Sequence, residues 1–203
     1  MTHDGCNDET TADDLVVRAK VDREAFGALY DRFFPLVHRY CHRRLRDNGA
    51  AEDVSSEVFL QVAGAMRRFP GTTVEDFRRW VYRIATNAIN AHLRQKTRRA
   101  GLLARAVQSG GRSTTDEISS ALEPASFAQE SISRALAHLS HREQSVLTLR
   151  FMEGLSYEEV AAVLNVRSAT LRVVASRAIK NLRRRLSQSI DAPLAEQPTR
   201  PTP

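Results

Sequence analysis

Apolar residues recur every three or four positions along most of this chain, and no stretch alternates strictly between apolar and polar residues. The first spacing places side chains on one face of a helix, whereas strict alternation is typical of a half-buried strand. The apolar face of the first helical stretch is formed by Phe26, Leu29, Tyr30, Phe33, Val37, Tyr40 and Cys41. Pro35 lies inside this stretch and should kink or divide the helix, because proline has no backbone N–H to donate. The pattern predicts an all-α protein.

Further helices are predicted over about residues 50–66 and 74–97, with the helix-breaking sequence Phe69-Pro-Gly-Thr-Thr73 between them. From about residue 100 to residue 130 the helical pattern fades into a glycine pair, a Ser/Thr cluster and scattered acids, which is typical of a linker. We therefore predict two small helical domains, over residues 23–99 and 131–187, joined by a flexible linker over residues 100–130. An acidic N-terminal tail would precede them at residues 1–22, and a Pro-rich, disordered tail would follow at residues 188–203.

The second domain contains a sequence typical of a helix-turn-helix. Ser156 and Glu159 form a capping box at the start of a short helix, and Asn165 suits the left-handed residue that ends it. A second helix follows almost at once. Its apolar positions are Leu171, Val174, Ala175, Ala178 and Leu182, and its outward polar positions include Arg172, Ser176, Arg177 and Lys180.

The charge of this second helix is one-sided. Residues 165–187 contain seven arginines and lysines and no Asp or Glu. Two ordinary packed helices with a solvated basic face are the alternative, but a helix that is merely soluble normally mixes both signs of charge. The excess of positive charge favours contact with phosphates, and therefore DNA as the ligand.

A second basic surface is predicted on the helix over residues 74–97. Its polar residues follow at intervals of three or four, which places them in one stripe: Arg79, Arg83, Asn87, Asn90 and Arg94. Phe69, Phe77, Trp80 and Tyr82 lie nearby, and arginine, asparagine and aromatic side chains bind unpaired bases and their phosphates. An ordinary amphipathic helix is the alternative, and for Trp80 alone we favour a place in the core.

The preceding helix carries the opposite chemistry. Asp53, Glu57 and Gln61 follow at intervals of four on one face, and an acidic face does not suit DNA. A metal-dependent nuclease is the catalytic interpretation, but no histidine or further acid joins the pair at ligand spacing. We interpret the stripe as a docking surface for a basic protein partner, and we expect no enzymatic activity.

Composition limits the remaining classes of function. The 203 residues include 30 Lys and Arg against 24 Asp and Glu, a net charge of +6, which favours a polyanionic partner. No apolar run approaches the roughly 20 residues that span a bilayer, and the first residues lack a signal peptide, so we expect a cytoplasmic protein without membrane insertion.

Cys6 and Cys41 cannot form a disulfide framework. His38, Cys41 and His42 lie within about one helical turn, but no second ligand cluster completes a metal or redox site, so no metal or cofactor is expected.

Four segments, in order, resemble the RNA polymerase sigma factors of the sigma-70 family and its extracytoplasmic-function group. The sequence from Phe26 to Tyr40 is similar to the opening of sigma region 2, and that from Ala51 to Leu60 to the core-polymerase-binding motif. The sequence from Phe77 to Asn87 resembles the promoter-melting and minus-10 helix, and that from Leu139 to Leu182 resembles region 4, which reads the minus-35 element. The resemblance implies a bacterial transcription initiation factor with region 2 over residues 23–99 and region 4 over residues 131–187.

The resemblance also implies a role for each surface. Core RNA polymerase would be bound by Asp53, Glu57, Phe59 and Gln61. The minus-10 DNA would be bound by Arg68, Phe69, Arg79, Trp80, Arg83, Asn87, Asn90 and Arg94, with a flipped base captured by the loop from residue 68 to residue 74. The minus-35 element would be bound in its major groove by Arg167, Ser168, Ala169, Thr170, Arg172, Val173, Ser176 and Arg177. An anti-sigma factor is a further partner expected for this group.

The recognition helix departs from the family pattern. Arg167 stands where members usually have the capping serine, so the cap should move to Ser168, and Val173 replaces a polar residue on the groove face. Valine can contact a thymine methyl group but cannot form a hydrogen bond with guanine. A conventional helix-turn-helix regulator, which binds an operator without polymerase, is the remaining alternative. Such a protein has no use for the acidic stripe.

Overall fold

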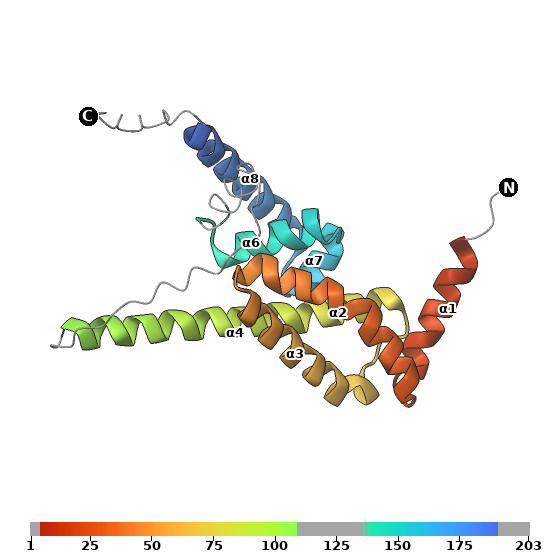
Figure 1. Cartoon of the computed structure of the whole chain (residues 1–203). Helices are drawn as coiled ribbons and strands as arrows, with labels where there is room; N and C mark the ends of the chain where they lie inside the picture. The colour runs from red at the N-terminus through yellow and green to blue at the C-terminus, as the bar shows by residue number, and fades with distance from the viewer. Residues whose placement is uncertain (1–4, 109–135, 137, 191–203) are drawn as a thin grey trace, which may run out of the picture.

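The computed structural model describes residues 5–108, 136 and 138–190 of the chain. Every regular element within these ranges is helical (Figure 1), which confirms the all-α prediction. None of the described helices is long and apolar enough to cross a membrane. The expected linker beyond residue 108 and the expected disordered tail from residue 191 onward lie outside the described residues.

The described helices form two bundles. The first consists of α1 (Gly5–Arg18), α2 (Arg23–Leu45), α3 (Asn48–Ala65), the 3-10 turn η1 (Met66–Arg68) and α4 (Val74–Gln108). The second consists of α6 (His141–Leu147), the π-helical turn η2 (Thr148–Met152), α7 (Tyr157–Leu164) and α8 (Ser168–Ile190).

The apolar faces predicted from the sequence meet in the core of the first bundle. Leu29 and Val37 of α2, Val58 of α3, and Phe77 and Ile89 of α4 are fully buried there. Burying a side chain of this size stabilises the fold by about 1.5 to 3 kcal/mol. Because one face of each helix is fixed in the core, the opposite faces of α3 and α4 are held in place as surfaces.

The second bundle contains the predicted helix-turn-helix. The capping box of Ser156 and Glu159 is present at the start of α7, and Asn165 adopts the left-handed conformation at its end, with a φ of 52°. The backbone N–H of Val166 then donates to the Ala161 carbonyl at 3.0 Å, which closes the turn. Helix α8 begins at Ser168. The Arg167 carbonyl accepts from the backbone N–H groups of Thr170 and Leu171 at 3.1 and 3.4 Å, so Arg167 occupies the N-cap position. The predicted shift of the cap to Ser168 is therefore wrong.

Three further boundaries differ from the sequence prediction. The segment expected to be an acidic tail forms α1, because Val16 and Ala19 are buried against the bundle. Helix α4 continues to Gln108, since no glycine pair or proline interrupts it before residue 110. Pro35 lies on the exposed side of α2 and does not divide it, because the neighbouring turns remain packed in the core.

The two bundles pack against each other. Helix α7 contacts α4, and η2 contacts α2, and buried residues of both bundles form one continuous apolar cluster. Figure 1 shows the C-terminal half of α4 and the length of α8 projecting from this packed centre in different directions. The surfaces predicted to bind partners can be placed on this framework.

Candidate nucleic-acid and protein interfaces

The acidic stripe of α3 lies on the surface. Asp53, Glu57 and Gln61 are all exposed, and the Gln61 side-chain amide donates to the Glu57 carboxylate at 3.1 Å. Leu60 lies beside them and is 74% exposed. A surface that combines carboxylates with an exposed leucine suits a basic, partly apolar protein partner.

Phe59 differs from its neighbours on α3. The resemblance groups it with the stripe, but its ring is buried, with its centroid 5.0 Å from that of Tyr30 and 5.6 Å from that of Phe34. The ring therefore holds α3 against α2 from beneath and is not offered to a partner. Leu60 is the apolar side chain on the surface. Sequence reasoning did not assign it a role, although its helical spacing from Glu57 places it on the same face.

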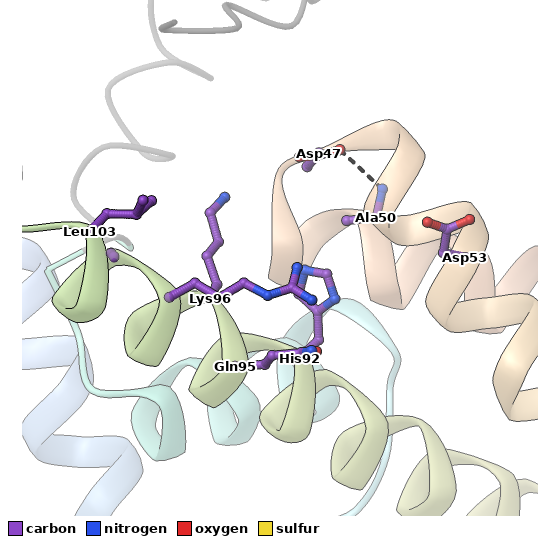
Figure 2. A pocket seen from close by; sticks show the side chains of 9 residues that line it. Asp47, Ala50, Asp53, His92, Gln95, Lys96 and Leu103 are labelled. Atoms are coloured by element: carbon purple, nitrogen blue, oxygen red, sulfur yellow. Dashed lines mark hydrogen bonds between the residues drawn. The ribbon is translucent and has the colours of Figure 1, made fainter. Parts of the chain in front are cut away.

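An open pocket of about 420 Å³ lies between α3 and α4, next to the acidic stripe (Figure 2). Asp47 and Asp53 line it on one side, and Lys96 and Arg99 line it on the other. Asp47 accepts a hydrogen bond from the Ala50 backbone N–H at 3.0 Å and so caps α3. Asp53 is therefore the carboxylate of this pocket that remains available to a partner.

The polar stripe of α4 forms a second surface. Arg83, Asn87 and Arg94 are exposed, and Arg79 and Asn90 are half-buried. The Arg79 guanidinium pairs with Asp76 one turn earlier. Arg83 reaches the second bundle, where its Nη2 donates to the Ala162 carbonyl at 2.6 Å.

The loop between η1 and α4 is held from within by aromatic rings. Phe69 is buried and stacks on Trp80, with ring centroids 4.5 Å apart and planes 18° apart. Trp80 is half-buried and packs against the core, as we favoured for this residue. A Cβ atom on Gly71 would lie only 2.4 Å from the Phe69 ring, so only glycine fits at that close approach. In this conformation Phe69 supports the loop and is not free to stack on a base.

The start of α4 is held by carboxylates from two elements. Asp76 accepts from the backbone N–H of Thr72 at 3.4 Å, and the Thr73 hydroxyl accepts from the Asp76 N–H at 3.1 Å. Burial raises the pKa of Asp76, but hydrogen bonds from Thr73, Thr72 and Arg79 outweigh that effect and leave the pKa below its usual value. The Val74 N–H donates to the Asp13 carboxylate of α1 at 2.7 Å. Sequence reasoning missed Asp13, because 61 residues separate it from Val74.

The recognition helix α8 presents its polar face to solvent. Seven of the eight residues expected to contact the minus-35 element are exposed, and Ser168 is half-buried. Leu171 on the opposite face is fully buried. Arg172 pairs with Glu158 at 3.4 Å and lies over the Tyr157 ring, 5.8 Å from its centroid. The exposed face of α8 is therefore polar and carries arginines that a solvent-side partner can reach.

Cys41 is a core residue rather than a ligand. It is buried, and burial raises the pKa of its thiol to about 12. Among the described residues, no group of three or more His, Cys, Asp or Glu side chains could hold a metal ion.

Comparison with known proteins shows that each of the two bundles matches a known protein family. The profile of Sigma-70 region 2 matches residues 29–99, and that of Sigma-70, region 4 matches residues 129–182. The ECF RNA polymerase sigma-E factor of Escherichia coli K12 is 31% identical over 179 residues, which cover 82% of this chain and 89% of that protein. The chain belongs to the sigma-70 family. This sigma factor is also 31% identical to the ECF RNA polymerase sigma factor BldN of Streptomyces coelicolor over 176 residues, which cover 85% of this chain and 65% of BldN.

Solved structures share the fold of this sigma factor. The sigma factor RpoE of Bartonella quintana, in complex with the anti-sigma factor NepR, matches 80% of this chain and 96% of its own, with a TM-score of 0.63 and 19% identity. CnrH, in complex with the cytosolic domain of CnrY, matches 90% of this chain and 98% of its own, with a TM-score of 0.60 and 22% identity. The match of region 2 as well as region 4 disfavours a conventional helix-turn-helix regulator.

Proposed function

We propose that this sigma factor binds core RNA polymerase, directs it to promoters with minus-10 and minus-35 elements, and helps to melt the DNA. The observation that carries the proposal is that the region 2 and region 4 matches coincide with two helical bundles, each with an exposed basic face. The boundaries proposed for the two regions remain residues 23–99 and 131–187.

Region 4 reads the minus-35 element in this proposal. The exposed face of α8 lies in the major groove, with Arg172 and Arg177 as its main contacts to DNA. Arginine can form two hydrogen bonds to the edge of guanine. Val173 is 50% exposed on the same face and can contact a thymine methyl group.

Region 2 binds the minus-10 element through α4. Arg79, Arg83, Asn87, Asn90 and Arg94 hold the strand and the adjoining duplex, and the loop from residue 68 to residue 74 receives a flipped base. Flipping a base costs a few kcal/mol, which contacts to that base must offset. The stacked pair of Phe69 and Trp80 gives the loop a fixed shape before DNA arrives, so little ordering is needed on binding.

The acidic stripe of α3 binds core polymerase, with Asp53, Glu57 and Gln61 as polar contacts and Leu60 as an apolar contact. Phe59 acts indirectly, by holding α3 in place.

We further infer that the protein has no catalytic activity and needs no cofactor. Its place of action is the bacterial cytoplasm, where polymerase and the chromosome are found.

An anti-sigma factor is a further proposed partner. The structural neighbour RpoE was solved in complex with the anti-sigma factor NepR, and CnrH was solved in complex with the cytosolic domain of CnrY. The second bundle of this chain carries an apolar groove of about 210 Å³, lined by Leu136, Leu147, Phe151, Met152, Ile179 and Leu182. Phe151 and Met152 are 57% and 42% exposed. Exposed apolar side chains around a groove are typical of a site for a partner helix.

Reconstitution with purified core polymerase tests the proposal. The expected result is co-elution of the two proteins on gel filtration and a promoter-specific run-off transcript that core enzyme alone does not make. Separate elution together with the absence of any specific transcript would reject it. Cleavage of DNA by the isolated chain in the presence of Mg²⁺ would instead favour a nuclease.

A further inference from the structure

The loop from residue 68 to residue 74 is held at both ends by the N-terminal segment of the chain. At its α4 end, the Asp13 carboxylate of α1 accepts from the Val74 N–H at 2.7 Å. At its η1 end, the Lys20 ammonium lies over the Phe69 ring, 5.8 Å from the ring centroid, which is within the range of a cation–π contact. Two residues that are close together in the sequence therefore contact the two ends of one loop.

The segment that carries these two side chains is itself fixed in place. Val16 and Ala19 are buried, and α1 contacts both α2 and α4, beside the chain that leads into α4 (Figure 1). The turn after α1 is closed by the Asp22 N–H, which donates to the Arg18 carbonyl at 2.9 Å. Helix α1 and the turn after it therefore hold both side chains at defined positions against the loop.

The contact from Asp13 supplies an acceptor that the loop does not supply. The first N–H groups of a helix have no acceptor within the helix. The Thr73 hydroxyl accepts from the Asp76 N–H at 3.1 Å, and the Val74 N–H donates to Asp13. Loss of the Asp13 carboxylate should loosen the point at which the loop enters α4, while the buried face of α4 keeps the rest of the helix in place.

Base reading should depend on this support more than binding to the DNA backbone does. Hydrogen bonds to a base tolerate little change in distance or angle, whereas phosphate contacts are electrostatic and position the DNA without reading its sequence. Arg83, Asn87 and Arg94 of the polar stripe lie further along α4 than the point that Asp13 holds. A chain with a looser loop should therefore discriminate less well among bases and keep its general affinity for DNA.

We propose that α1 is a positioning element for the reading of the minus-10 sequence. Asp13 and Lys20 are positioning residues, which hold the loop in the shape that receives the flipped base. They act through the loop and not through contacts of their own with DNA. The hold of α1 on the loop stands on the contacts alone, whereas its effect on base reading rests on the proposed function of the loop.

Holoenzyme reconstituted from the full chain and core polymerase is used to measure base reading. It selects from a library of single-stranded DNA with a randomised segment, and sequencing of the selected molecules gives the preferred sequence. Fluorescence anisotropy then gives the affinities for the preferred DNA and for a scrambled DNA of the same composition. The ratio of these two affinities measures discrimination, and the affinity for the scrambled DNA measures general binding.

Four variants separate the positioning role from a general loss of structure. Asp13→Ala removes the acceptor, whereas Asp13→Asn keeps a side-chain oxygen that can accept from the Val74 N–H. Lys20→Met removes the charge over the Phe69 ring and keeps an apolar side chain. Asp14→Ala is the matched control, since Asp14 is the next residue of α1 and is exposed. Far-UV circular dichroism verifies that each variant keeps its helices.

Hydrogen exchange tests the hold of α1 on the loop without DNA. In the free chain, mass spectrometry follows exchange of the amides of residues 69–77. We expect faster exchange in Asp13→Ala, a smaller change in the same direction in Lys20→Met, and exchange at the parent rate in Asp13→Asn and Asp14→Ala. Unchanged exchange in both Asp13→Ala and Lys20→Met would overturn the hold of α1 on the loop.

We expect Asp13→Ala to lower the discrimination by roughly fivefold, the contribution of one base contact at the low end of its usual range, with the affinity for scrambled DNA unchanged. Asp13→Asn and Asp14→Ala should keep the parent ratio. Parent-like discrimination in Asp13→Ala, or an equal loss of affinity for preferred and scrambled DNA, would overturn the positioning role. A parent holoenzyme that selects no preferred sequence would reject the proposed function of the loop and with it the effect of α1 on base reading, whereas faster exchange in Asp13→Ala would still support the hold.

Discussion

Arg172 is the residue through which DNA reading by α8 can be tested by a single substitution. Its guanidinium is exposed and is held near the start of the recognition helix by Glu158 and the Tyr157 ring. We expect Arg172→Ala to weaken binding of a minus-35 duplex by about 1 to 3 kcal/mol if the side chain reads a base. Arg142→Ala, which removes an exposed arginine from α6, is the control in an anisotropy titration. Equal affinities for the two variants would reject the assignment.

Cys41 allows the packing of the first bundle to be tested by its chemistry. The thiolate is the reactive form of cysteine, and burial raises the pKa of Cys41 to about 12, so almost no thiolate exists at pH 8. In a Cys6→Ser variant we expect Cys41 to react with a disulfide reagent only after unfolding in urea. Rapid reaction of the native protein at pH 8 would contradict the buried position and would reopen a redox role for this residue.

At the scale of elements, Asp13 links α1 to the start of α4. Loss of a carboxylate that caps a helix costs about 0.5 to 2 kcal/mol, so Asp13→Ala should lower the free energy of unfolding by about that amount. Trp80, the only tryptophan of the chain, stacks on Phe69 in the loop that precedes α4. Because Asp13→Ala loosens the start of α4, the fluorescence emission of Trp80 should also change.

Asp14→Ala is the matched control for Asp13→Ala. Asp14 lies next in the chain, but its carboxylate is 64% exposed and lies 3.9 Å from Arg18, and surface pairs of this kind contribute little. Urea unfolding followed by circular dichroism compares the two. If both variants unfold at the same urea concentration as the parent chain, Asp13 does not hold α4.

Helix α3 is the element on which polymerase binding should depend. Asp53→Lys reverses the charge at an exposed position, so we expect it to abolish co-purification with core polymerase while circular dichroism stays unchanged. Asp31→Lys, at an exposed position of α2, makes the same change of charge away from the stripe. Retained binding by Asp53→Lys, or equal loss in both variants, would count against a docking surface on α3.

The elements that the sequence predicted well are those specified by neighbouring residues. The capping box of Ser156 and Glu159 and the left-handed Asn165 depend on contacts within a few positions, and the buried faces of α2, α3 and α4 follow from helical spacing. The sequence did not predict that α1 is a helix, because acidic residues dominate its composition. Its few apolar residues are buried only through contacts with α2 and α4. The π-helical turn η2 has no local signal of this kind.

At the scale of the whole molecule, the two regions were predictable and their packing was not. Each region has its own apolar pattern and its own basic face. The contacts that join them, such as Glu153 with Arg43, connect residues 110 positions apart, and charged residues at that separation have no pattern that identifies them as partners. Phe59 and Phe69 were expected on binding surfaces, but both rings are buried in the structure. The sequence could not separate the two places, because an aromatic side chain packs well in a core and also binds ligands well.

The most direct test of the central claim is sequencing of the transcripts that the reconstituted holoenzyme initiates on genomic DNA. We predict transcript starts that core polymerase alone does not produce, with shared sequences at the minus-10 and minus-35 positions. Arg172→Ala should weaken the dependence on the minus-35 sequence. Transcript starts identical to those of core polymerase alone would contradict the account.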